Sequence, residues 1–80
     1  IKIRDVTTTK EGICYVDLSS DSINKIINGN INEKIAIYSI VNSMVSLYNV
    51  EKVQFLIEGE KIEETMGHLD YTKPFEGMDI

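Results

Sequence analysis

The feature that most constrains the fold is a stripe of apolar side chains at helical spacing between residues 32 and 48. These side chains recur three and four positions apart, which places them along one side of an α-helix. Serine and asparagine side chains occupy much of the opposite side. The pattern therefore predicts one long amphipathic helix over residues 32–48. Its stripe consists of Ile37, Ile40, Val41, Met44, Val45 and Tyr48.

Short polar residues indicate where helices begin and end. Asn30 stands three residues before Glu33, a spacing that resembles a capping box with Asn30 as the N-cap. Asn49 tolerates the left-handed conformation and is the expected end of the long helix. A shorter helix is expected after the N-cap candidates at residues 19–22, and Gly29 interrupts it.

Alternating and β-branched segments predict the strands. Residues 2–9, 13–18 and 52–57 have these patterns, and residues 61–65 are expected to return as a short fourth strand after a turn at Gly59-Glu60. In residues 13–18 the alternation places Cys14, Val16 and Leu18 on the buried face. The order of elements predicts the α+β class: a two-layer sandwich with a small, mostly antiparallel, three- to four-stranded sheet and one long helix on one face.

Length and charge limit the classes of function. Eighty residues make a single domain, residues 1–80. The net charge of −5 arises entirely from residues 51–80, because residues 1–50 hold five acidic and five basic side chains. An acidic chain is a poor match for nucleic acid or an anionic membrane surface. We therefore expect no nucleic-acid partner, and membrane association only through an anchor outside this chain.

The reactive side chains do not form a catalytic pattern. His68 and Asp70 are two of the three or four ligands that zinc requires, and the chain has no second histidine. Cys14 lies on the expected core face, where a thiol is a poor nucleophile. Asp17 with Asp21, and the glutamates of residues 58–64, are expected to remain solvated rather than act as a catalytic pair. We expect no enzyme activity, cofactor or metal.

Three apolar residues are expected on the sheet face that points away from the long helix. They are Ile13, Tyr15 and Leu56, and apolar residues gathered on an exposed face often mark an interface. The alternatives are that they are scattered surface residues or that a segment absent from this chain covers them.

Five segments together resemble the GerMN domain of bacterial sporulation and spore germination proteins. They are YVDLS at 15–19, IYSIVNS at 37–43, VQFLIEGEK at 53–61, GHLD at 67–70 and PF at 74–75. The resemblance implies an extracytoplasmic domain, often carried by lipoproteins or membrane-anchored chains, with a fold similar to the ring-building motif and no established catalytic residues. The family's first strand and helix would precede Ile1, so the resemblance implies a domain that lacks them.

The resemblance implies a non-catalytic protein–protein interaction module of a sporulation, germination or cell-envelope protein, capable of self-association or ring formation. The expected location is the cell envelope or the spore intermembrane space. The alternative is a module that binds peptidoglycan or another carbohydrate by stacking sugars on aromatic rings. Its candidate residues are Tyr38, Tyr48 and Tyr71.

Overall fold

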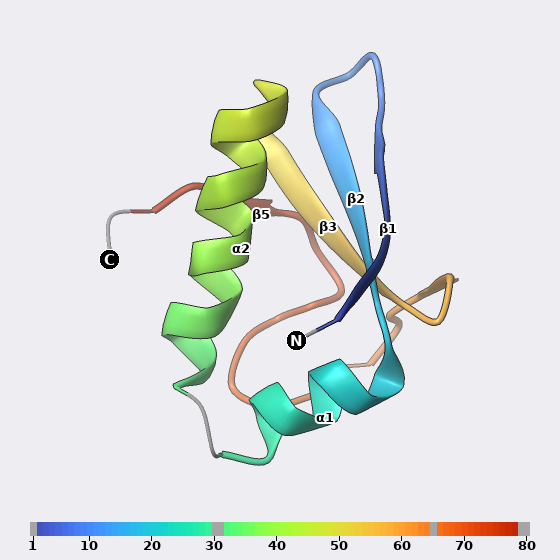
Figure 1. Ribbon diagram of the computed structural model, residues 1–80, viewed down its shortest axis with the longest axis vertical. Helices are drawn as coiled ribbons and strands as arrows, with labels where there is room; N and C mark the ends of the chain where they lie inside the picture. The colour runs from blue at the N-terminus through green and yellow to red at the C-terminus, as the bar shows by residue number, and fades with distance from the viewer. Residues whose placement is uncertain (1, 30–31, 65, 79–80) are drawn as a thin grey trace.

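The computed structural model describes residues 2–29, 32–64 and 66–78, and it contains five strands and two helices in those ranges (Figure 1). The predicted α+β class is confirmed. The elements are β1 (Ile3–Thr8), β2 (Ile13–Leu18), α1 (Ser20–Ile27), α2 (Glu33–Tyr48), β3 (Lys52–Ile57), β4 (Glu60–Lys61) and β5 (Phe75–Glu76).

The strands form one mixed sheet in the order β1-β2-β3-β4, and β5 also pairs with β3. Three of its ladders are antiparallel, but the central ladder between β2 and β3 is parallel and runs in register from Ile13 beside Lys52 to Leu18 beside Ile57. The prediction of a mostly antiparallel sheet of three to four strands with one long helix was therefore only partly right. The sheet has five strands, one ladder is parallel, and α1 joins α2 in the core. The parallel ladder arises because two helices, rather than a tight turn, connect β2 to β3.

Both helices begin at side-chain caps. The hydroxyl of Ser19 accepts the Ser22 N–H at 3.1 Å and starts α1, which confirms the predicted short helix. Asn32 caps α2 by accepting the Ile35 N–H at 3.2 Å, whereas Asn30, the predicted cap, lies outside the described residues. Asn49 ends α2 in the left-handed conformation with φ 53°, as predicted.

The core lies between the helices and one face of the sheet. In Figure 1, α2 runs beside β3 and α1 lies across the end of β2. The side chains of Cys14, Val16 and Leu18 are fully buried, as the alternation predicts. They join Val53 and Phe55 from β3 and the buried stripe of α2 in one cluster. In the stripe, Ile37, Val41 and Met44 are buried and Ile40 and Val45 are half-buried, but Tyr48 at its end is 48% exposed.

The chain after β4 completes this core. Tyr71 is fully buried and Phe75 is 7% exposed, so Phe75 holds the tail against the body as expected. The rings of Phe55, Tyr71 and Phe75 lie 5.5 to 6.3 Å apart in edge-on or tilted arrangements. Aromatic pairs in such geometry contribute about 0.5–1.5 kcal/mol each beyond the area they bury.

The β3–β4 turn differs from the sequence prediction by one residue. Ile57 pairs with Glu60, so the two turn residues are Glu58 and Gly59 rather than Gly59 and Glu60. Both have positive φ, 51° and 80°, as a type I′ turn requires. The fourth strand is also shorter than predicted: it contains two residues instead of five.

We predict that replacing Phe55 with alanine lowers the free energy of unfolding by about 3–5 kcal/mol, because it leaves a cavity beside the rings of Tyr71 and Phe75. Urea unfolding followed by circular dichroism measures the loss. Phe55→Leu, which fills part of that space, should lose about half as much or less. The control is Leu47→Ala at a side chain that is 73% exposed, with an expected change within about 0.5 kcal/mol. Equal losses in Phe55→Ala and the control would contradict the described core.

Candidate interaction face and its surroundings

The three predicted interface residues lie on the sheet face opposite the core. Within the parallel ladder Tyr15 stands beside Gln54 and Leu56 beside Asp17, whereas Val16 stands beside Phe55 on the core face. Ile13, Tyr15 and Leu56 are each half-buried. The core cluster that both helices join lies on the other side of the sheet. The structure thus brings the three residues onto one face, which we call the outer face.

A polar network borders the outer face at the end where β2 and β3 finish. The carboxylate of Asp17 accepts the Gly59 N–H at 2.8 Å and lies 3.2 Å from the Arg4 guanidinium. Glu58 accepts the Ser20 N–H at 2.9 Å and lies 3.6 Å from the same guanidinium. Both carboxylate oxygens of Asp17 are engaged, Oδ1 by the Gly59 N–H and Oδ2 by Arg4, so Asp17 holds the β3–β4 turn and the first strand in place.

The two edges of the sheet differ in whether their backbone groups are free to pair with another strand. β1 is an edge strand, and Val6 is its one half-buried residue while the others are exposed. On the far side, β5 pairs with the first two residues of β3 and β4 with the last two. Between them, the Gln54 side chain donates to the carbonyls of Phe55 at 3.2 Å and Tyr71 at 3.0 Å. The β3 edge is thus occupied by this chain, whereas β1 presents unpaired backbone groups.

The Glu33 carboxylate holds the loop that carries His68. It accepts the His68 backbone N–H at 3.0 and 3.1 Å, accepts the Tyr71 hydroxyl, and lies 3.4 Å from His68 Nδ1. Gly67 permits this approach, since a Cβ there would lie 2.5 Å from a Glu33 oxygen and its φ is +66°. The sequence pattern predicted Glu33 as part of a capping box. The structure instead directs its carboxylate to a segment 35 residues later.

The other reactive side chains have separate environments. The Asp70 carboxylate accepts the hydroxyl and the N–H of Thr72, which lowers the pKa of Asp70, while the His68 ring is 90% exposed. Burial raises the pKa of the Cys14 thiol and keeps it protonated in the core. Within residues 2–29, 32–64 and 66–78, no three histidine, cysteine or acidic side chains gather as a metal site.

The three tyrosines considered for sugar stacking do not form a surface cluster. Tyr71 is fully buried, and the ring of Tyr38 packs edge-on against Phe75 at 5.6 Å. Tyr48 is 48% exposed. Tyr71 therefore does not fit the role of a surface ring for sugar stacking, because its hydroxyl and ring are both used inside the molecule.

These features define a small α+β domain with a covered face, an outer face and one unpaired edge. Among known proteins, the model of the family described as Germane, sporulation and spore germination, matches residues 1–63. The chain belongs to this family. No curated protein and no solved structure matches the chain. The matched residues include the outer face and β1, whereas the segments at 67–70 and 74–75 that contributed to the GerMN resemblance lie beyond them. Among the described residues, no helix combines the length and apolar character needed to cross a membrane.

Tyr71 generates a prediction about stability at high pH. Burial, and then the hydrogen bond to Glu33, raises the pKa of Tyr71 well above its ordinary value of about 10. Because the folded state retains a proton that the unfolded state releases, the contribution of Tyr71 to stability should be constant below pH 10 and fall above it. The raised pKa of the Cys14 thiol adds a loss of stability at high pH that the wild type and a Tyr71 variant share. One such group contributes a slope of up to about 1.4 kcal/mol per pH unit.

The measurement is urea unfolding between pH 8 and 11, with Tyr71→Phe as the comparison. The variant should be about 1–2 kcal/mol less stable near pH 8, because Glu33 loses a hydrogen-bond donor. It should also lose less stability than the wild type as the pH rises. Identical pH profiles for the two proteins would contradict the described environment of Tyr71.

Proposed function

We propose that this chain is a non-catalytic protein–protein interaction module of a bacterial sporulation, germination or cell-envelope protein. The observation that carries the proposal is the outer face, where Ile13, Tyr15 and Leu56 remain partly exposed while both helices pack against the other side of the sheet. Apolar side chains that a fold leaves uncovered on one face supply binding energy when a partner excludes water from them. Membership of a sporulation and spore germination family supports the biological setting.

The proposed contact combines the outer face with the β1 edge. A partner strand that pairs with β1 would extend the sheet by backbone hydrogen bonds, and its side chains would continue the same face. The exposed threonines and charged residues of β1 favour reversible association over a permanent strand pair. The GerMN resemblance and its similarity to the ring-building motif make a second copy of the chain the first partner to test.

Several side-chain arrangements support a non-catalytic role. Asp17 and Glu58 bind backbone N–H groups, Cys14 is buried in the core, and the His68 ring extends into solvent. These four side chains thus have a structural role or stand apart from one another. A carbohydrate-binding role is the weaker candidate, since only Tyr48 of its three rings is substantially exposed.

The proposed location is extracytoplasmic, in the cell envelope or the spore intermembrane space. It rests on family membership and on the GerMN resemblance. Any membrane attachment would come from a segment outside this chain.

We predict that the chain self-associates and that Leu56→Lys weakens this association about tenfold or more, because it places a charge in the apolar contact. Sedimentation velocity over a range of concentrations measures the effect. The added lysine reduces the magnitude of the net charge from −5 to −4, so increased repulsion between copies cannot explain a loss. Tyr15→Lys should act in the same way.

The matched control is Leu47→Lys, an apolar-to-lysine change at a side chain of α2 that is 73% exposed and remote from the outer face. It should leave association unchanged, and circular dichroism should show that all variants are folded. A wild-type chain that stays monomeric at millimolar concentration would refute self-association. A larger effect of Leu47→Lys would assign the contact to α2 instead. Retention on purified cell-wall sacculi would favour the carbohydrate alternative.

A further inference from the structure

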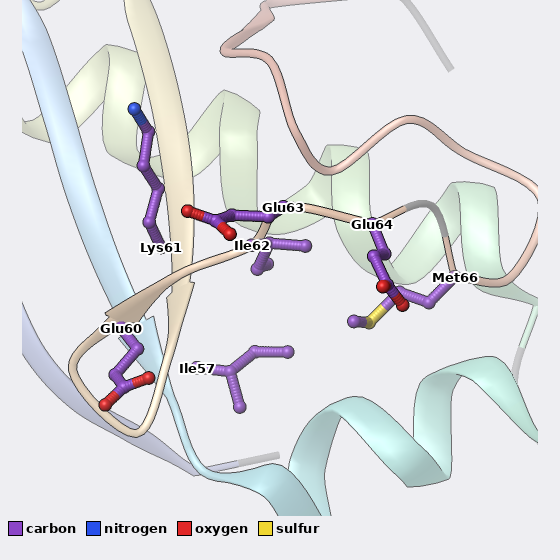
Figure 2. Close-up of a pocket in the computed structure, with 7 residues that line it drawn as sticks. All are labelled: Ile57, Glu60, Lys61, Ile62, Glu63, Glu64 and Met66. Atoms are coloured by element: carbon purple, nitrogen blue, oxygen red, sulfur yellow. The ribbon is translucent and has the colours of Figure 1, made fainter.

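A groove lies beside the β3–β4 hairpin. It has a volume of about 650 Å³ and opens to solvent (Figure 2). Figure 2 shows the side chains of Ile57, Ile62 and Met66 pointing into a common space between the hairpin and the segment that follows it. Ile62 is 5% exposed, whereas Ile57 and Met66 are half-buried and accessible from the groove. The groove therefore has an apolar floor.

The rim of the groove is acidic. Glu60, Glu63 and Glu64 line it and are all exposed. Lys61 is the one basic lining residue, and its side chain extends along β3 away from the apolar floor in Figure 2. The ion pairs found in the described part of the chain involve Asp17, Glu58 and Glu33 but none of the rim glutamates. The rim thus has a net charge of −2 and its carboxylates have no cationic partner in the described residues.

We propose that this groove binds a basic segment of a partner protein, in which lysine or arginine side chains flank an apolar residue. The apolar residue would displace water from Ile57 and Met66, and the cationic groups would lie beside the rim carboxylates. Lysine and arginine suit such a site because their aliphatic stems cover apolar surface while their charged ends stay in water. Charge complementarity of this kind directs the choice of partner and accelerates encounter.

The structure favours a cationic chain over the other occupants of an acidic groove. The rim carboxylates do not gather as a metal site in the described residues, so a single ion does not account for their arrangement. Nucleic acid and anionic lipid would be repelled by the rim. The inference extends the proposed interaction role to a second surface, and it does not depend on self-association through the outer face.

The experiment is a titration of the whole isotope-labelled chain with a short capped peptide of alternating lysine and leucine, followed by NMR. We expect backbone shifts confined to residues 57–66. Two reference peptides replace every lysine with glutamate or with serine, and both should bind at least about tenfold more weakly. Raising the salt from about 20 to 300 mM should also weaken binding, because the rim pairs are exposed to solvent.

Two charge-matched triple variants test the groove itself. E60Q/E63Q/E64Q removes the rim charges, and we expect it to weaken binding of the lysine–leucine peptide about tenfold, since exposed pairs contribute modestly and act together. The control E11Q/E51Q/E76Q removes three exposed charges elsewhere and should change the affinity less than about twofold. Tyr15→Lys on the outer face, which stands beside Gln54 rather than in the β3–β4 hairpin, should change peptide binding less than about twofold, which separates this proposal from the proposed function.

Three results would overturn the proposal. Equal losses in the two triple variants would show attraction by net charge alone. Equal binding of the serine peptide would show that the occupant is apolar and uncharged. Absence of binding, or shifts centred outside residues 57–66, would show that the groove is not the site.

Discussion

The parallel pairing of β2 with β3 is the constraint from which the rest of the architecture follows. Two adjacent strands that run in the same direction cannot be joined by a tight turn, so the chain must leave the sheet and cross back over it. Here it does so through α1 and α2, which both join the core cluster. Because that crossover uses one side of the sheet, neither helix covers the outer face. The asymmetry between a covered and an uncovered face is thus a product of connectivity.

The pattern of apolar residues was enough to predict β1, β2, β3 and both helices, but not β5 or the pairing of the strands. Cys14, Val16 and Leu18 alternate, and the α2 stripe has helical spacing, so both local structure and the buried side of each element were predicted correctly. Strand direction depends on the path between strands, which alternation does not report. The turn at Glu58-Gly59 was missed by one residue because glutamate with positive φ is uncommon, and nothing in its neighbours indicates that it adopts this conformation.

Long-range polar contacts were the least predictable part. The hydrogen bond that the His68 N–H donates to the Glu33 carboxylate joins the start of α2 to a loop that has no periodic sequence pattern. A capping-box spacing explained Glu33 locally, and only the fold could show that its carboxylate is used elsewhere. Tyr71 was misjudged for a related reason, since a tyrosine in an irregular tail gives no pattern from which burial can be inferred. Ile13, Tyr15 and Leu56 were placed on one face because period-two alternation alone decides that property, and whether a partner uses them remains a prediction.

The Gln54 side chain has a consequence for assembly. Together with β4 and β5 it closes the β3 border, so in the described part of the chain β1 is the one long border to which another full-length strand can be added. A molecule with one such border can join a second copy and then has no equivalent border left. Edge pairing alone would therefore stop at two molecules and protect the chain against runaway fibre growth. Any larger closed assembly would have to recruit a different surface.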